Sequence, residues 1–310
     1  MKRLMILLLA LLMCAVPALA ENVRTAEVYD RTADEGALSI RFVDMGAPES
    51  GSPGDCVILI SPDDQVMVID SGLSENCEDV AAALDKLGVT RIDALVISHP
   101  HGDHTQNMPY LMLNYEVGAV YTSYIETPDA NNYIKYMAAI EAQNLPHIRL
   151  AQGDSFSFGE QVTVDILSPE KEIEYPEGFD DTADFVNNHS LVMKFTYGES
   201  TYLTSGDLYL AAESALVKTC KEALDVDVIK LNHHGYSTSS GITWCNATSP
   251  EIAVAPSDTL YNFSTYKRLS RKGDVYVTGL DGTVCVRMYP DDSKTVVTER
   301  DYDYAAIGLK

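Results

Sequence analysis

The chain has few cysteines, no Cys-x-x-Cys pair and no excess of positive charge. Its six cysteines are scattered over 310 residues, which excludes a disulfide-rich scaffold and a zinc-finger pattern. Lysine and arginine number 22 against 46 aspartates and glutamates, for a formal net charge of −24. The basic footprint of nucleic-acid-binding proteins is therefore missing. We expect no strong affinity for nucleic acids, and a small or neutral substrate fits this charge better.

Long apolar runs are also missing, except at the start of the chain. Two basic residues precede an apolar run over residues 5–16, and Ala18-Leu19-Ala20 is a small-x-small cleavage site. This pattern predicts a bacterial-type secretory signal peptide over residues 1–20, and hence a secreted protein. The run is shorter than the roughly 20 residues that span a membrane. We find no candidate span in the mature chain, and whether the exported protein stays at the cell wall is left open.

Past residue 20, short apolar runs alternate with stretches of helical spacing. Strands are predicted over 38–43, 56–60, 66–69, 92–97, 119–122, 147–150, 162–167, 190–197, 201–204, 226–231, 274–278, 283–288 and 295–297. Helices are predicted over 77–87, 108–115, 130–143 and 209–223, whereas 236–272 is mixed. Strands in two clusters with helices between them suggest a layered α/β architecture, of which an αββα sandwich is one form.

The same pattern predicts how the chain divides. We expect one domain over residues 37–310, since strand signals run from its start to its end. Residues 21–36 are polar and aperiodic, and we predict that they form a linker or a loosely attached start.

Histidine is scarce, and its distribution points to a metal site. Three of the seven histidines fall within His99-Pro100-His101-Gly102-Asp103-His104, directly after the strand predicted over 92–97. A loop there can aim two imidazoles at one point and the aspartate and third imidazole at a neighbouring point. These donors suit zinc and other borderline metals, and two cations roughly 3.5–4 Å apart can share a water. We therefore predict two divalent cations, zinc first and manganese as the alternative.

This motif resembles the signature of the metallo-β-lactamase fold superfamily, and other segments agree. They are Val68-Ile69-Asp70-Ser71-Gly72, Tyr202-Leu203-Thr204-Ser205-Gly206-Asp207 and Ile229-Lys230-Leu231-Asn232-His233-His234-Gly235. Together with Asn187-Asn188-His189-Ser190-Leu191-Val192, they are similar to the soluble hydrolase domain of the ComEC competence protein family. They also resemble the related secreted phosphorylcholine esterases. The resemblance covers residues 38–288 and implies the αββα four-layer sandwich of the metallo-β-lactamase type.

The resemblance implies two sets of metal ligands. His99 and His101 would bind the first cation. Asp103 and His104 would bind the second, and the carboxylate of Asp207 would bridge the two.

Four further positions are implied with alternatives left open. His189 would be the third protein ligand of the first cation, although a position facing solvent is the competing interpretation. Of the pair His233 and His234, we slightly favour His233 as the ligand that completes the second cation, with His234 near the substrate's leaving oxygen. Asp70 would orient a ligand histidine through a hydrogen bond.

The implied reaction is hydrolysis, with Asp103 and His234 as catalytic residues. A cation lowers the pKa of its bound water to about 7, and the resulting hydroxide attacks a phosphorus or carbonyl centre. We favour a small or polymeric phosphodiester, nuclease-like or phosphorylcholine-esterase-like. A lactone or β-lactam hydrolase with the same centre is the alternative, and a non-catalytic metal- or wall-binding protein is a third. Tyr236 stands where this branch often has serine, so substrate specificity need not be shared.

Overall fold

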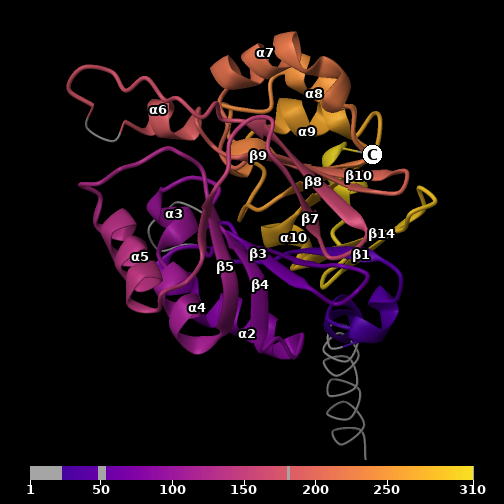
Figure 1. Cartoon of the computed structure of the whole chain (residues 1–310). Coiled ribbons are helices and arrows are strands. Elements are labelled where there is room, and N and C mark those ends of the chain that lie inside the picture. The colour runs from indigo at the N-terminus through magenta and orange to yellow at the C-terminus, as the bar shows by residue number, and fades with distance from the viewer. Residues whose placement is uncertain (1–22, 48–53, 180–181, 310) are drawn as a thin grey trace, which may run out of the picture.

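The first of two facing sheets is built largely from the N-terminal half of the chain. The computed structural model describes residues 23–47, 54–179 and 182–309 (Figure 1). In the described part, this sheet has eight strands in the order β15-β14-β1-β2-β3-β4-β5-β6. They are β1 Leu38–Phe42, β2 Val57–Ile60, β3 Val66–Ile69, β4 Arg91–Val96, β5 Glu116–Thr122, β6 His147–Arg149, β14 Val284–Met288 and β15 Lys294–Thr298. Because β1 pairs with β14, both ends of the predicted domain contribute to this sheet.

The second sheet is built from the C-terminal half and has seven strands in the described residues, in the order β13-β12-β11-β10-β9-β8-β7. They are β7 Ser155–Phe158, β8 Val162–Ser168, β9 Val192–Tyr197, β10 Ser200–Thr204, β11 Val228–Lys230, β12 Ile252–Ala255 and β13 Asp274–Val277. Strands β7 and β12 were not predicted from the sequence.

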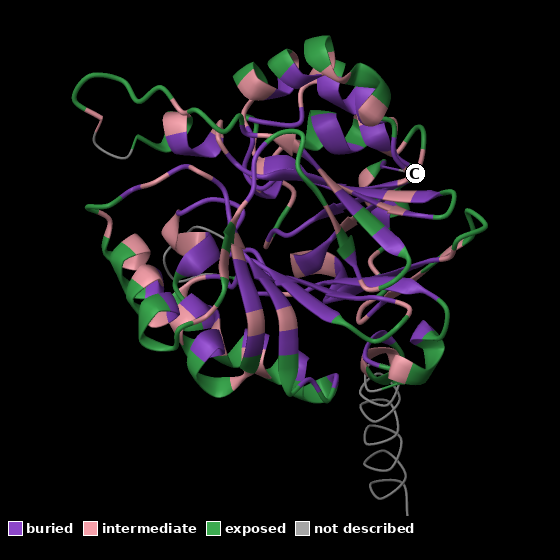
Figure 2. Cartoon of the chain, viewed as in Figure 1, coloured by how far each residue is buried: buried purple, intermediate pink, exposed green. Residues whose placement is uncertain are grey.

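Helices cover the outer face of each sheet (Figure 1). The first sheet is packed against α2 Cys77–Lys86, α4 Met108–Asn114 and α5 Asn131–Ala142, and the second against α7 Leu210–Thr219, α8 Ile242–Thr248 and α9 Phe263–Leu269. The shorter helices are α3 Gly102–Thr105, α6 Ala183–Asn187 and α10 Thr278–Asp281. The exposed residues in Figure 2 lie mainly on the outward sides of these helices and in loops.

Side chains that alternate between the two faces of a strand fill the core between the sheets and the cores under the helices. In β2, Val57 and Leu59 enter the core between the two sheets, whereas Ile58 and Ile60 enter the core under the helices of the first sheet. Successive strand side chains point to opposite faces, so a strand buried on both faces is apolar at every position. The predicted αββα sandwich is confirmed.

The described segment before β1, residues 23–36, is attached to the domain, whereas a linker or loose start was expected over residues 21–36. Residues 23–28 are helical and η1 Arg31–Asp34 follows. The two carboxylate oxygens of Asp34 accept hydrogen bonds from Arg41 Nη2 at 2.9 and 2.8 Å, and Arg287 Nε donates at 2.7 Å. The attachment is made by buried charged pairs, which hydrophobic periodicity does not register.

The predicted signal peptide, residues 1–20, lies outside the described residues. In the described ranges, no helix has the length and apolarity needed to cross a membrane. The five cysteines of the described residues, which are Cys56, Cys77, Cys220, Cys245 and Cys285, are free thiols.

Candidate metal centre

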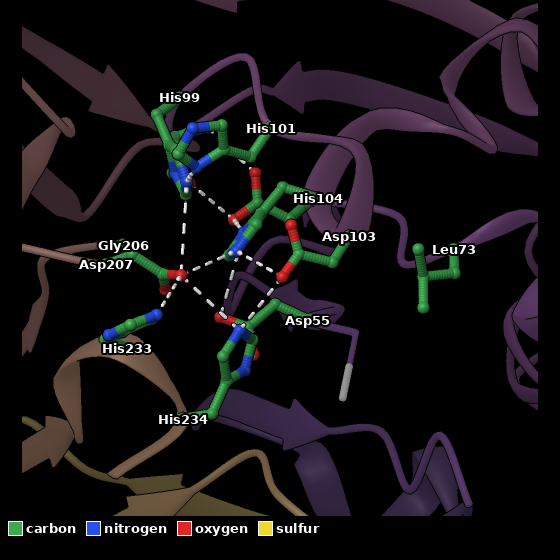
Figure 3. A network of polar contacts seen from close by, with 12 residues as sticks. Asp55, Leu73, His99, His101, Asp103, His104, Gly206, Asp207, His233 and His234 are labelled. Atoms are coloured by element: carbon green, nitrogen blue, oxygen red, sulfur yellow. Dashed lines mark hydrogen bonds and ion pairs between the residues drawn. The ribbon is translucent and has the colours of Figure 1, made fainter. Parts of the chain in front are cut away.

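Most of the predicted site residues lie where strands of both sheets end. In the first sheet, β3 and β4 are parallel neighbours, and in the second, β10 and β11 are parallel neighbours. The chain leaves these strands into the segments that carry Asp70, His99 to His104, Asp207, and the pair His233 and His234. Carboxyl ends of parallel strands are the usual place for a site in layered α/β folds. Figure 3 shows the side chains converging from the two sheets.

Asp207 lies at the middle of this convergence. Its Oδ2 is 3.1 Å from His104 Nε2, 3.4 Å from His234 Nε2 and 4.0 Å from His99 Nε2 (Figure 3). The preceding Gly206 has φ +50°, and a Cβ there would lie 2.9 Å from the Ser190 Cβ. Glycine is therefore needed at position 206 to turn the chain so that Asp207 faces the histidines.

Hydrogen bonds on the far side of two rings fix which nitrogen faces the centre. Ser98 Oγ donates to Asp70 Oδ2 at 2.6 Å and lies 3.0 Å from His99 Nδ1. The hydroxyl proton is already used, so we assign the proton of this contact to His99 Nδ1. His104 Nδ1 lies 2.8 Å from Asp70 Oδ2 and donates to that carboxylate. With Nδ1 turned to these partners, the Nε2 atoms of His99 and His104 face the centre, and the hydrogen bond expected of Asp70 is present.

The carboxylate of Asp55 orients the ring of His234, as that of Asp70 orients His104. His234 Nδ1 lies 3.0 Å from Asp55 Oδ1 and 3.2 Å from the carbonyl oxygen of Pro256. Both neighbours only accept, so the Nδ1 carries a proton and the Nε2 atom faces Asp207. Lys230 Nζ lies 2.5 Å from Asp55 Oδ2. Carboxylate–histidine pairs of this kind are the usual support of metal-binding imidazoles.

Three residues of the site were not predicted from the sequence: Asp55, Lys230 and Ser98. Asp55 lies outside the histidine motifs, and Lys230 stands inside an apolar strand run. The sequence signal that could have marked Lys230 is its place inside an apolar strand run that leads into the histidine pair. Lysine is almost never fully buried unless it is paired.

Charge and burial oppose one another throughout the centre. Burial and the neighbouring rings of His104 and His101 hold the pKa of His99 well below its ordinary value. Burial alone would raise the pKa of Asp207, but His104 and His234 hold it well below the usual range of a carboxyl. An ionised carboxylate beside imidazole rings in a buried site favours the binding of a cation that the ring nitrogens can coordinate.

The donor set fits a metal ion. One ligand atom each from Asp103, His104, Asp207 and His234 lies within 4.8 Å of the others. His104 Nε2, His234 Nε2 and Asp207 Oδ1 are buried and make no hydrogen bond, an arrangement that costs free energy unless another group fills it. Asp55 and Asp70 also lie close to His104, but they face its protonated Nδ1 and so support the ring.

A second group of donors lies on the other side of Asp207. His99 Nε2 and His101 Nδ1 are 3.0 Å apart, with ring centroids 4.7 Å apart and planes at 83°. Two imidazoles and one oxygen of Asp207 can hold a cation there, which fits the predicted first position.

A family model described as the metallo-beta-lactamase superfamily matches residues 51–241. The chain belongs to the metallo-β-lactamase superfamily. It is 27% identical over 201 residues to competence protein ComA of Neisseria gonorrhoeae, covering 64% of this chain and 25% of that protein. It is 24% identical over 169 residues to ComE operon protein 3 of Bacillus subtilis, covering 54% and 20%. The chain thus spans a quarter or less of these relatives, and the resemblance to ComEC-like competence proteins is confirmed.

Solved metallo-β-lactamase folds agree with the architecture. The fold protein YhfI from Bacillus subtilis aligns with a TM-score of 0.50 at 13% identity, covering 77% of this chain and 96% of that one. A mutant of CmlA β-hydroxylase aligns with a TM-score of 0.51 at 13% identity, covering 81% and 54%. At these identities the likeness concerns the fold alone.

Within this superfamily site, the two adjacent histidines occupy different environments. His234 is fully buried, and its Nε2 is 3.4 Å from both Asp103 Oδ2 and Asp207 Oδ2. His233 keeps 18% of its side chain exposed, its Nε2 is 3.8 Å from Asp207 Oδ2, and its Nδ1 is 2.5 Å from Thr238 Oγ1. His234 therefore lies nearer to the carboxylates of Asp103 and Asp207, and His233 lies at the edge, while the choice of the ligand between them stays a prediction. Both residues have left-handed φ angles, of 47° and 51°.

His189 lies apart from these contacts. Its Nδ1 is 2.7 Å from the carbonyl oxygen of Phe185, and the two rings pack with centroids 4.3 Å apart. The residue lines a cavity of about 320 Å³ together with Asn188 and Glu170. Among the described residues, no hydrogen bond or ion pair joins His189 to Asp207. Its role as a ligand stays a prediction.

Aromatic rings extend from the edge of the centre. The ring of His233 packs against Tyr209 and Tyr236, with centroids 4.9 Å away in each case. Tyr236 packs in turn against Tyr261 at 4.1 Å. A substrate that reaches His233 would therefore meet partly exposed rings, which suit apolar or planar groups.

Proposed function

We propose that the chain is a metal-dependent phosphodiesterase with two cations at the Asp207 centre. The observation that carries the proposal is the position of Asp207 between two groups of imidazole nitrogens. Its Oδ2 lies 4.0 Å from His99 on one side and 3.1 Å from His104 on the other. A carboxylate in that position can serve both cations. The nitrogen-rich donor set favours zinc.

The residues of the chain organise this centre before any substrate arrives. Bound cations would supply a water of lowered pKa and would stabilise negative charge that develops on the reacting group. Asp70 and Asp55 hold the Nδ1 protons of His104 and His234, so that both Nε2 atoms point inward. Because these supports are buried, the rings need little rearrangement when the reaction begins.

His233 has the place expected for contact with the leaving group. Its Nε2 faces the centre, and the rest of the ring lies at the partly exposed edge. Burial, the largest cause, lowers the pKa of His233 despite the nearby carboxylate of Asp207. We therefore assign the contact with the leaving oxygen to neutral His233 and metal ligation to His234, with Asp103 beside it.

The choice of phosphodiesters is supported by the His-His-Gly motif and by the similarity to competence proteins. The net charge of −24 disfavours long polyanions, so a small ester or a weakly charged polymer is the proposed substrate. The pattern of residues 1–20 supports action outside the cytoplasm.

The test is metal content and hydrolysis of bis(p-nitrophenyl) phosphate by the purified protein. We expect close to two metal ions per chain and turnover that Asp207→Asn lowers at least about 100-fold. Asp225→Asn is the matched control, because Asp225 is exposed on the surface. Metal without phosphodiester turnover would shift the proposal to lactone or β-lactam substrates, and absence of bound metal would overturn it.

A further inference from the structure

Glu213 in α7 is a buried carboxylate that the proposed chemistry does not use. Only 1% of the residue is exposed. Its Oε1 accepts hydrogen bonds from Asn232 Nδ2 at 2.8 Å and from the Ser240 backbone N at 2.5 Å, and its Oε2 accepts from the Gly241 backbone N at 2.9 Å. Within the described part of the chain, no lysine or arginine forms an ion pair with it. The carboxylate is therefore balanced by these three N–H donors.

The three donors lie at the two ends of one loop. Asn232 is the residue before His233, and Ser240 and Gly241 end the loop where α8 begins. Residues 232–241 thus form a segment that carries both histidines of the pair, and we call it the histidine loop. One side chain from a neighbouring helix closes this loop by binding both of its ends.

The histidine loop needs such support because its backbone is strained. His233, His234 and Ser240 have φ angles of 47°, 51° and 53°, a region that residues with a Cβ avoid. Such conformations persist where the surroundings hold them in place. Contact with α7 is close, since a Cβ at Gly241 would lie 2.6 Å from Leu210 Cδ2 and 3.3 Å from Glu213 Oε2.

We propose that Glu213 is a positioning residue that clamps the two ends of the histidine loop and so aims His234 Nε2 at Asp207. The inference rests on the proposed metal centre. Glu213 acts through Asn232 and the backbone and does not itself reach the cations.

Ionisation of Glu213 gives the clamp a measurable signature. Burial raises the pKa of Glu213 to about 7, against the lowering effect of its three hydrogen bonds. The titratable groups on the packed elements are Cys245 of α8, whose Sγ donates to the Ser240 carbonyl oxygen at 3.2 Å, and Arg268 of α9 beside that thiol. A proton on Oε2 would point at the Gly241 N–H, so protonation removes one of the three bonds.

The test compares Glu213→Gln with the wild type by amide hydrogen exchange in the metal-free protein. An amide group at position 213 offers one acceptor oxygen in place of two. We expect the protection of the Ser240 and Gly241 amides to fall at least about tenfold. Metal affinity, measured by competition with a chelator, is expected to fall about 10–100-fold. Protection of Gly241 should show a step near pH 7 in the wild type and none in the variant. Glu222→Gln is the control, since Glu222 is exposed.

Unchanged protection and metal affinity in folded Glu213→Gln would overturn the proposal. If that variant does not fold cooperatively, Asn232→Ala decides, because it removes one of the three donors and leaves the carboxylate in place. It should lower metal affinity in the same direction by a smaller factor, and wild-type affinity would refute the clamp. A wild-type protein that binds metal but hydrolyses no phosphodiester would remove the proposed function, while the exchange data would still decide the role of Glu213.

Discussion

Lys230 and Asp55 form a buried ion pair directly behind the histidine pair. The Lys230 Nζ is 2.5 Å from Asp55 Oδ2, with 2% and 0% of the two side chains exposed, and it also donates to the Gly206 carbonyl oxygen at 3.0 Å. Burial alone would raise the pKa of Asp55, but Lys230 and His234 lower it below its ordinary value. The ammonium thus keeps ionised the carboxylate that orients His234.

Lys230→Met should leave the Asp55 charge unpaired in the interior. Breaking a buried pair by removing one partner costs about 3–5 kcal/mol of the free energy of unfolding. Urea denaturation of the metal-free protein measures this loss. The double variant Asp55→Asn with Lys230→Met should recover part of it, because no unpaired charge remains. Equal free energies for the wild type and the single variant would contradict the assignment.

Asp70→Asn should weaken the centre without disturbing the backbone. Asp70 has φ 62°, a conformation that asparagine tolerates. The carboxylate accepts from Ser98 N at 2.8 Å, Ser98 Oγ at 2.6 Å and His104 Nδ1 at 2.8 Å, and an amide cannot accept all three. We expect metal affinity to fall about 10–100-fold, measured by chelator competition. An affinity equal to that of Asp225→Asn would show that His104 needs no such support.

His234→Ala and His233→Ala should separate ligand from substrate contact. Because His234 Nε2 lies between Asp103 and Asp207, its removal should bring the metal content toward one ion per chain. Removal of His233 should keep the metal content and lower kcat by about 10²–10³-fold, the usual loss for one hydrogen-bond donor at a developing negative charge. Metal analysis and steady-state kinetics measure both. The opposite pattern would restore His233 as the ligand.

Much of the fold was predictable because buried strands are short apolar runs bounded by turns. The range 66–69 for β3 matches the structure residue for residue. β7, with the sequence SFSF, was missed because three of its four residues are not buried. α6 has five residues, too few to show a helical period.

The site was predictable to the extent that its residues are contiguous in sequence. The segment from His99 to His104 displays its chemistry without any structure. Asp55, Lys230 and Glu213 each contribute one side chain from a separate element, and only the stacking of the two sheets and their helices brings them to the histidines. The choice between His233 and His234 depends on a left-handed backbone, which hydrophobic periodicity does not encode.

Asp34→Ala should show that the N-terminal segment contributes to the stability of the domain. The substitution leaves the guanidinium groups of Arg41 and Arg287 buried, with 0% and 4% of their side chains exposed. We expect a loss of about 3–5 kcal/mol in the free energy of unfolding. The control is Asp64→Asn, which removes the charge of an 80% exposed carboxylate that pairs with Arg31 and keeps a residue that tolerates the φ of 74° there. In this control the loss should stay below about 1 kcal/mol. Equal losses in the two variants would mean that residues 23–34 add nothing beyond a surface contact.

Glu213 should make the stability of the metal-free protein fall as the pH rises. Burial raises its pKa from the ordinary value of 4.5 to about 7, so the folded chain holds this proton over a range in which the unfolded chain has released it. The contribution to stability is full below about pH 4.5 and is lost as the pH rises through about 7. The difference in unfolding free energy between the wild type and Glu213→Gln should therefore change by up to about 3 kcal/mol between pH 5 and pH 8, with the wild type relatively weaker at pH 8. Urea denaturation across this range measures it, and Glu222→Gln should follow the wild type. If the curves of Glu213→Gln and the wild type run parallel, Glu213 is ionised throughout and its three hydrogen bonds outweigh its burial.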